Sequence, residues 1–402
     1  MEIQQIIKEK YMQTNKICLL FLFFGLLVSC QPKEKFDWEI GLSAPKYYSS
    51  SPSVRFFYNN KIIHSASSNI GIQPGWGETS GGYASGSEPD EVPDSLHVEW
   101  LCGTDGYHYE GNFKLPREKM LQLFQNPVTD IDGTVRPYSL IIVGAAPGGN
   151  ITVWMRAISV LTEIAKFKAE NKGIWKENDE EFTAHRNEIK TSKEFVNSEY
   201  NIFHYLHGIP YSVWEKGEKK YDYDVGFASE DLANNNFHKA IAFYSKDGSE
   251  VMTNSQGNSL ENLSNLSDFI LNNNENNNKI PVQMYCQWIS PDKLSWFESQ
   301  VALPKNFQQQ CDVFVKHSSK FRIVVFMEKY DFNKNLPYTY GQIWLVGKKD
   351  KEKIMRFKAS KLNTKTTNFI GSKYSLPKGF KFPKWEGREK LIKPDVEFWQ
   401  EE

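Results

Sequence analysis

The segment Asp130-Ile131-Asp132-Gly133-Thr134 has the Asp-x-Asp-Gly-Thr spacing of phosphatases that use an aspartate as nucleophile. In that chemistry the first carboxylate attacks phosphorus and the second handles the proton. Both carboxylates must then stand at the end of a buried apolar strand. The preceding residues 125–129 contain Pro127 and no apolar run. The sequence therefore favours an acidic turn closed by glycine over a phosphatase site.

His204 and His207 are three residues apart and can share one face of a helix, as metal ligands do. No zinc-protease pattern surrounds them, and Gly208-Ile209-Pro210 ends the helix at once. The sequence also contains no GxSxG elbow, no paired CxxC motif and no phosphate-binding loop. We therefore expect no metal, no cofactor and no catalytic residue, and the sequence leans toward a protein that is not an enzyme.

The elements that would position any site are organised around a stretch that occurs twice. Residues 96–116 return as residues 284–304, which places Trp100 on Trp288. In the first copy apolar and polar residues alternate, with the period of a half-buried strand. A Leu-Pro dipeptide ends each copy, and a helical pattern follows it. Both copies therefore predict a β-hairpin followed by a short helix.

Further blocks repeat in the same order along the chain and support an internal duplication. The matched blocks are residues 38–42 with 223–227, Trp154 with Trp344, and Trp214 with Trp385. Tryptophans at alternating strand positions usually pack in a core, so we expect the matched tryptophans to be core residues. We predict an α+β, β-rich fold of two tandem repeated domains, each an antiparallel sheet with a short helix after the Leu-Pro dipeptide.

The predicted boundaries follow the repeat. They are 1–29 for a lipoprotein signal peptide, 30–35 for a tether, 36–174 for the first repeat domain, 175–220 for a helical linker and closing segment, and 221–402 for the second repeat domain. Smaller elements are predicted inside these boundaries. They are a strand at 36–42, a hairpin at 54–63, a surface loop at 65–95, a strand–turn–strand unit at 140–156, a strand at 159–168 and an amphipathic helix at 259–271.

The N-terminal 29 residues have the features of a signal peptide. Three lysines precede the apolar run at 17–28, which is shorter than the ~20 residues that span a bilayer as a helix. Leu27-Val28-Ser29-Cys30 matches the lipobox of bacterial lipoproteins, in which the cysteine carries lipid. A plain secretory signal with an incidental Cys30 is the alternative, and Met12 is a second candidate start. We expect a bacterial cell-envelope protein anchored through lipid on Cys30, with the outer membrane favoured over the inner one.

Charge and cysteine content exclude two further classes. With 48 basic and 49 acidic residues, the chain gives no electrostatic reason to bind nucleic acid. Cys102, Cys286 and Cys311 are an odd number, so no complete disulfide framework is implied. Cys286 and Cys311 occupy core-type positions, which favours buried thiols over a bridge between them.

The order of these motifs resembles the bacterial lipoprotein family catalogued as domain of unknown function 2931. The residues that carry the resemblance are Gly75-Trp76-Gly77, Trp100, Tyr109, Leu115-Pro116, Pro147-Gly148-Gly149, Trp154, Gly208-Ile209-Pro210 and Trp214. The resemblance covers about residues 36–227 and, more weakly, 221–398. The second copy departs from it, because residues 329–340 replace the Pro-Gly-Gly turn and no Gly-Trp-Gly precedes Trp288. The resemblance implies a lipoprotein and brings no catalytic residues.

Features that differ between the copies are the best candidates for a partner surface, because shared features serve the shared fold. Exposed aromatic residues on loops are typical anchors of protein interfaces. The candidate partner contacts are Trp76, Tyr330, Phe332, Tyr338 and Tyr340. The function expected is a membrane-anchored, non-enzymatic binding protein, in one version an immunity protein that neutralises a toxic enzyme. The alternative is an envelope hydrolase with an active site built from loops.

Overall fold

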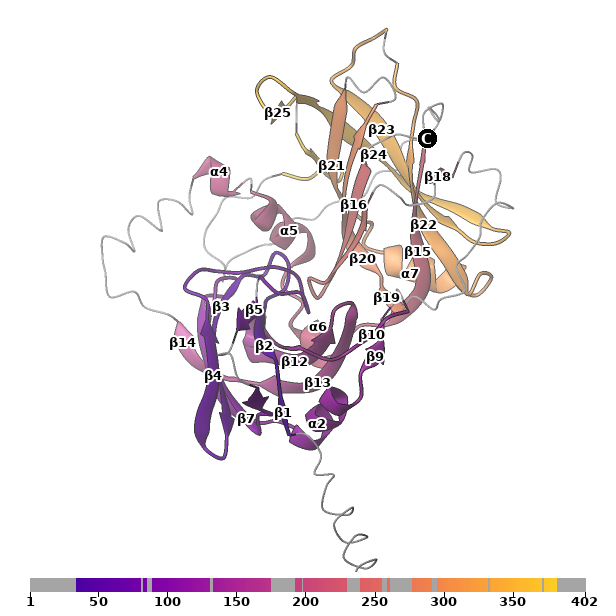
Figure 1. Cartoon of the computed structure of the whole chain (residues 1–402). Coiled ribbons are helices and arrows are strands. Elements are labelled where there is room, and N and C mark those ends of the chain that lie inside the picture. The colour runs from indigo at the N-terminus through magenta and orange to yellow at the C-terminus, as the bar shows by residue number, and fades with distance from the viewer. Residues whose placement is uncertain are drawn as a thin grey trace, which may run out of the picture.

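The computed structural model contains two β-rich halves that lie end to end, with three helices between them (Figure 1). It describes residues 34–80, 82–84, 89–130, 133–174, 192–196, 198–229, 239–254, 259–260, 277–290, 295–331, 333–370 and 372–381. The predicted signal peptide, Cys30 and Trp385 lie outside these residues. Within them, no helix is both long and apolar enough to cross a membrane.

The first half is a sandwich of two five-stranded sheets. One sheet has the order β13 (Val160–Lys168), β12 (Asn150–Ala157), β11 (Leu140–Ala146), β2 (Glu39–Ser43) and β5 (Gly82–Ala84). The other has the order β14 (Glu170–Ile174), β8 (Tyr107–Lys114), β7 (Ser95–Cys102), β3 (Ser50–Tyr58) and β4 (Lys61–Ser67). Buried apolar residues from both sheets and from helix α2 (Arg117–Gln125) form one core between them.

Two short pairs complete this half, β1 (Lys35–Phe36) with β6 (Asp90–Glu91) and β9 (Val128–Thr129) with β10 (Val135–Arg136). The hairpin predicted within 96–116 is confirmed as β7 and β8, and the helix predicted after it is confirmed as α2. The predicted Asn59-Asn60 turn is confirmed between β3 and β4, with φ of 49° and 60°. Asparagine tolerates this left-handed conformation better than most residues, which explains the residue type there.

The sheets are not wholly antiparallel, and this part of the prediction is wrong. β2 pairs with β11 in parallel, and in the second half β15 (Lys220–Ser229) pairs with β22 (Lys320–Met327) in the same way. A parallel pair needs a long crossover between its strands. Between β2 and β11 the crossover contains four of the five strands of the opposite sheet together with α2, and it cannot be read from local periodicity.

The turn between β7 and β8 is tied to the Pro-Gly-Gly turn of the other sheet by one carboxylate. Asp105 Oδ2 accepts hydrogen bonds from the Tyr109 hydroxyl at 2.9 Å and from the Gly148 backbone N–H at 2.8 Å. Gly148 has φ of 74°, and a Cβ atom there would lie 2.6 Å from the ring of Tyr211. Glycine is therefore required at this point, where the two sheets and the linker meet.

The second half has one continuous 12-stranded sheet arrangement. Its main path is β17 (Glu250–Asn254), β16 (Lys239–Ser245), β20 (Pro281–Ile289), β21 (Trp296–Ala302), β24 (Lys351–Asn363), β23 (Tyr338–Val346), β22, β15 and β18 (Ser259–Leu260). The short strands β19 (Asn277–Lys279), β25 (Asn368–Phe369) and β26 (Tyr374–Ser375) pair with β15, β24 and β21. Helix α7 (Phe307–Phe314) follows β21, as the sequence predicts.

The two halves have the same order of main strands. In the first half the chain leaves β12 as β13 and continues as β14 beside β8. In the second half the single long strand β24 corresponds to both β13 and β14, because it pairs first with β23 and then with β21. Trp100 faces Tyr109 across β7–β8, and Trp288 faces Phe297 across β20–β21.

The two halves also share a local irregularity in the pairing of corresponding strands. The pairing of β12 with β13 shifts between Val153 and Trp154, and that of β23 with β24 shifts between Ile343 and Trp344. A β-bulge of this kind bends a strand and increases its twist. In both halves the extra residue, Ile164 or Ile354, lies on the strand opposite the tryptophan, so the same partner strand is bulged.

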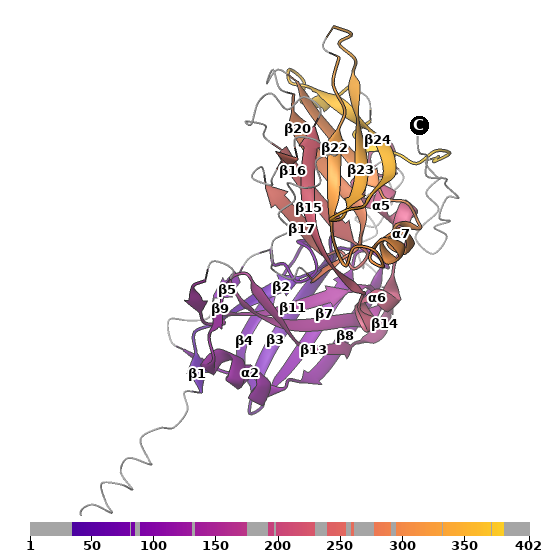
Figure 2. The ribbon, with the colours of Figure 1, turned by 90° about the vertical axis from the view of Figure 1, so that its right-hand side faces the viewer.

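Helices α4 (Lys193–Val196), α5 (Glu199–His207) and α6 (Tyr211–Lys216) lie between the halves, and Figure 2 shows α5 and α6 at their junction. The ring of Phe203, on α5, stacks on Tyr47 at 4.3 Å, and Tyr47 meets Tyr244 of β16 edge to face at 5.3 Å. From α6, Trp214 donates its indole N–H to Asp247 O at 3.0 Å. One aromatic cluster therefore joins both halves.

Two predicted elements need correction. The segment 65–95 is not a plain surface loop, because it contains β5, β6 and the half-buried Trp76. Ser259-Leu260 is a strand that pairs with β15 and not the start of a helix; residues 261–271 lie outside the described part. Strand pairing with β15 outweighed the local helical pattern. The three cysteines at 102, 286 and 311 are buried and free, as predicted.

Candidate functional site

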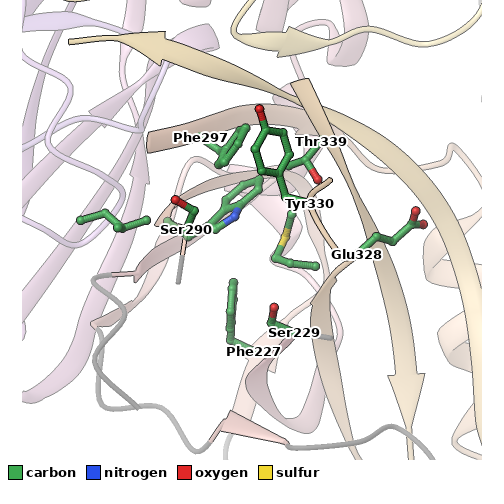
Figure 3. Close-up of a pocket in the computed structure, with 10 residues that line it drawn as sticks. Phe227, Ser229, Ser290, Phe297, Glu328, Tyr330 and Thr339 are labelled. Carbon is green, nitrogen blue, oxygen red and sulfur yellow. The ribbon is translucent and has the colours of Figure 1, made fainter. Parts of the chain in front are cut away.

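A small hollow lies within the second half, among residues of its sheet and of the loop before β23. It is lined by Phe227, Ser229, Trp288, Ile289, Ser290, Phe297, Met327, Glu328, Tyr330 and Thr339. Figure 3 shows Phe297, Tyr330 and Thr339 gathered on one side and Phe227 with Ser229 on the other. Its cavity volume is about 10 Å³, which is near the least that holds one water molecule. The hollow is therefore a packing space and too small for a substrate.

Tyr330 closes this hollow, and the expectation that it is an exposed partner contact is wrong. Only 5% of its surface is exposed. Its hydroxyl donates a hydrogen bond to Leu336 O at 2.8 Å, and its ring meets Phe297 at 4.9 Å. The loop before β23 folds back over the core, so an aromatic residue in a loop here fills space inside the fold.

A larger, open hollow of about 310 Å³ lies in the first half. It is lined by Asp37, Trp38, Glu39, Ser139, Leu140, Arg156 and Ile158. Its one lining cation, Arg156, is held by Glu78, with Nη2 at 2.7 Å from Oε1 and Nη1 at 2.9 Å from Oε2. The guanidinium is therefore already neutralised by a bidentate partner and is a poor anchor for an anion.

The outer face of β23 and β24 carries aromatic rings with cations stacked on them. Tyr338 and Tyr340 lie on this face, alternating with the buried Thr339, and their ring centroids are 5.5 Å apart. Lys358 Nζ lies 3.6 Å from the Tyr338 centroid, and the Arg356 guanidinium carbon lies 3.7 Å from that of Tyr340. Both tyrosines are half-buried and reach solvent beside these cations.

The other predicted contacts have different surroundings. Trp76 packs edge to face on Trp154 at 4.9 Å, so its ring covers the first half's own sheet. Phe332 lies outside the described residues. Of the four candidate contacts that the structure describes, only Tyr338 and Tyr340 lie together on one solvent-facing surface.

A cluster of two carboxylates and a lysine lies at the junction of the halves. Asp247 Oδ2 is ion-paired with Lys279, and its Oδ1 accepts hydrogen bonds from the Ser249 N–H at 3.0 Å and the Ser249 hydroxyl at 2.7 Å. Glu218 Oε2 accepts a hydrogen bond from the Asp247 N–H at 3.2 Å. Burial and the charge of Asp247 together raise the pKa of Glu218 to about 7, against the opposing effect of Lys279.

No local sequence pattern predicts this cluster. Glu218 follows α6, Asp247 lies in the β16–β17 turn and Lys279 ends β19, so only the tertiary fold brings them together. A carboxyl group with a pKa near neutrality beside a second carboxylate is the kind of pair that acid–base catalysis uses. Trp214 donates a hydrogen bond to the Asp247 backbone, and Lys279 pairs with the Asp247 carboxylate. These contacts also fit a buried network that only stabilises the fold.

The two histidines considered as metal ligands have separate partners. His204 Nε2 lies at 2.5 Å from Tyr47 O, and His207 Nε2 lies at 3.4 Å from Gln283 Oε1. Gly208, with φ of 68°, ends α5 directly after them, as the sequence predicts. The histidines attach the helix to the first half and to the second half respectively.

Asp130 starts the turn between β9 and β10, which agrees with the predicted acidic turn. Its carboxylate pairs with Arg136 at 3.2 Å and accepts a hydrogen bond from the Ser159 hydroxyl. The Gly133 N–H donates to Asp130 O at 2.9 Å, which closes the turn. No long strand delivers this carboxylate to a sheet end, since β9 has two residues.

Residues 25–212 match a family model described as a protein of unknown function, DUF2931. The match covers the first half and most of the helices between the halves. No curated protein matches the chain. No solved structure matches it either.

Proposed function

We propose that this chain, with a DUF2931 region in its first half, is a bacterial envelope lipoprotein that is held at a membrane by lipid on Cys30 and binds a protein partner. The observation that carries the proposal is the aromatic and cationic face of β23 and β24. Aromatic rings and arginine are enriched at the energetic centres of interfaces. The partner surface is expected to be acidic at Lys358, which would face it, whereas the Arg356 charge is already paired with Glu328.

In the first half the corresponding face of the sheet, around Trp154, is covered by Trp76 from the same chain. Trp76 packs against Trp154, and a Cβ atom on Gly144 would lie 2.7 Å from Trp76 and 2.6 Å from Trp154. At the matching point of the second half, Trp344 is half-buried and donates its indole N–H to Gln342 Oε1 at 2.8 Å. The face of the second half is the more open of the two around its tryptophan.

The Arg356 cation on this face is held in a fixed position, which lowers the entropy cost of binding. Glu328 accepts hydrogen bonds from Arg356 Nε at 2.7 Å and Arg356 Nη2 at 2.6 Å. Gln342 donates to the same carboxylate at 2.7 Å. These bonds hold the pKa of Glu328 below its usual range, against the effect of burial, so the carboxylate stays charged.

We expect Tyr338→Ala and Tyr340→Ala each to reduce recovery of the partner by at least about 10-fold, since interface anchors contribute about 2 kcal/mol or more. The measurement is affinity capture from detergent-solubilised envelopes with the full chain. Tyr58→Ala is the matched control, because Tyr58 is also a half-buried tyrosine with a cation, Arg117, at 4.8 Å.

Recovery in wild type and control should fall as salt rises, because the partner's acidic groups are screened over shorter distances. Equal recovery by all four proteins, with the fold intact by circular dichroism, would remove the β23–β24 face from the proposal. The identity of the captured protein then separates the versions: a toxic enzyme would make the chain its immunity or inhibitor protein.

Lipid on Cys30 accounts for membrane attachment in this proposal. We expect Cys30→Ser to move most of the protein from the membrane fraction to the soluble fraction, because two or three acyl chains hold a protein firmly and none would remain. The measurement is fractionation with mass spectrometry of the mature N-terminus. A Cys102→Ser variant is the control, since Cys102 is a buried thiol. Retention of Cys30→Ser in membranes, with no lipid mass on wild type, contradicts the idea.

We also infer that the second half is a second copy of the unit in the first half. The same strand order, the matching pairs Trp100–Tyr109 and Trp288–Phe297, and the bulge before Trp154 and Trp344 support this. An identical bulge position is hard to obtain by chance, since bulges are conserved features within families.

An envelope hydrolase is the second candidate function, and the raised pKa of Glu218 beside Asp247 favours it. Such an enzyme would use Glu218 as a proton donor near neutral pH. Its activity against envelope polymers should then vanish in Glu218→Gln while partner capture remains. Activity that survives this substitution would leave the cluster a structural role only.

A further inference from the structure

The outer face of the β7–β8 hairpin carries three potential metal ligands in adjacent positions. His97 and Glu99 alternate with the buried Val98 along β7, so both point away from the core. Glu110 lies directly opposite Glu99 on β8. One ligand atom from each of the three side chains lies within 4.8 Å of the others.

The imidazole of His97 is oriented as a metal ligand would be. Its Nδ1 lies 2.9 Å from Asn112 Oδ1, and because an amide oxygen only accepts, Nδ1 carries the hydrogen. Nε2 then keeps its lone pair. This atom is buried and has no hydrogen-bond partner, and only 7% of the residue is exposed. Metal-bound histidines are held in this way, with the second nitrogen donating to a fixed oxygen.

The buried nitrogen faces the carboxylates. Nε2 lies 3.9 Å from Glu110 Oε1, which is too far for a hydrogen bond. Metal bonds of about 2.0–2.2 Å place tetrahedral ligands about 3.4 Å apart. A small inward movement of the half-buried Glu99 and Glu110 would therefore bring all three ligand atoms to bonding distance.

Three carboxylates gather at this place against two cations, Lys172 and Arg55, of which Arg55 lies opposite His97 on β3. Glu99, Glu110 and Glu170 pair in register across three neighbouring strands, so like charges stand directly opposite each other. Such pairs destabilise a sheet. Lys172 pairs with Glu170 at 2.6 Å, at the outer end of the row. A cation between Glu99 and Glu110 would remove the repulsion at its centre.

The second half supplies a cation at the corresponding position from its own chain. The residues that correspond to His97, Glu99 and Glu110, each 188 positions later, are Tyr285, Gln287 and Glu298. Gln287 and Glu298 are opposite each other on β20 and β21, as Glu99 and Glu110 are on β7 and β8. Lys373 Nζ lies 3.2 Å from Glu298 Oε1. The same point on the fold is thus neutralised by lysine in one half and faces a histidine lone pair in the other.

We propose that His97, Glu99 and Glu110 bind a divalent transition-metal cation of the zinc class. Imidazole with two carboxylates suits such ions, whereas calcium and magnesium prefer oxygen ligands alone. Asn112 is a positioning residue that fixes the histidine tautomer. Three protein ligands leave a fourth position for water or for a group of a partner. This inference does not depend on the proposed function.

The test uses the full chain in detergent, freed of metal with a chelator, and titrates Zn²⁺ by calorimetry. We expect one equivalent to bind, and His97→Gln or Glu110→Gln to weaken binding by about 100-fold or more. Asn112→Leu should weaken it by about 10- to 100-fold, as loss of an oriented outer partner does. His108→Gln is the matched control, since this histidine lies on the same hairpin outside the triad, and it should leave the affinity unchanged.

A second readout separates metal binding from a merely structural role. Without metal, Glu110→Gln should raise the melting temperature, because it removes like-charge repulsion. With Zn²⁺, wild type should gain stability and the variant should not. The proposal is overturned if Zn²⁺ does not saturate at one equivalent, if His97→Gln binds as wild type does, or if His108→Gln weakens binding as much as His97→Gln.

Discussion

Phe203→Ala is expected to lower the free energy of unfolding by about 3–5 kcal/mol and to split thermal unfolding into two transitions. The Phe203 side chain is fully buried, and its ring contacts Tyr47 at 4.3 Å, His207 at 4.5 Å and Tyr48 at 5.8 Å. The ring therefore belongs to the core of neither half. Its loss leaves a cavity in the cluster that couples them, and scanning calorimetry of the full chain measures both effects.

The matched control for this prediction is Phe56→Ala. Phe56 is also fully buried, but it lies in the core of the first half. Its removal should cost a similar free energy and lower the temperature of the single shared transition, while the junction stays intact. If Phe203→Ala instead shifts a single transition as Phe56→Ala does, the aromatic cluster does not couple the halves.

The local sequence pattern predicted those elements whose core face is set by an alternation of apolar and polar residues. Val98 and Trp100 face the core while His97 and Glu99 lie on the opposite face of the strand, so β7 and its hairpin partner could be read from the period of two. The same alternation also placed His97 and Glu99 on one face. The register of the hairpin would have added Glu110 to them, and a search across the turn could have found the metal ligands.

Contacts between distant segments could not be read in this way. Whether Tyr330 is an interface anchor or a core residue depends on the loop folding back toward Phe297, and the sequence carries no periodic signal in that loop. The parallel pairing of β2 with β11 depends on a crossover that contains most of the second sheet. Glu218, Asp247 and Lys279 meet only because three loops and strand ends converge at the junction.

The cluster of Glu218, Asp247 and Lys279 gives the second large effect. Lys279→Met is expected to cost about 3 kcal/mol at pH 8, because it leaves the buried carboxylate of Asp247 without its cation. The cost should be measured as the change in the free energy of unfolding in urea between pH 5 and pH 8. Lys219→Met is the matched control, since the Lys219–Asp312 pair is exposed and its loss should change stability much less than the loss of Lys279.

The pH dependence follows from Glu218, whose pKa is raised to about 7 in the folded protein. A raised pKa means that the folded state binds the proton more tightly than the unfolded chain, in which a glutamate has a pKa of about 4.3. This stabilisation is complete below about pH 4.3 and is lost as the pH rises through about 7. Lys279 lowers the pKa of Glu218, so its removal raises that pKa further.

The cost of Lys279→Met should therefore fall between pH 8 and pH 5, because Glu218, one of the two carboxylates, becomes neutral over that range. Adding Glu218→Gln to Lys279→Met should abolish most of this pH dependence, since the amide is neutral throughout. A cost that stays constant from pH 5 to pH 8 in the single variant would show that Glu218 does not titrate there. It would also remove the observation that favours an acid–base role for this cluster, and leave the envelope-hydrolase candidate without support from the fold.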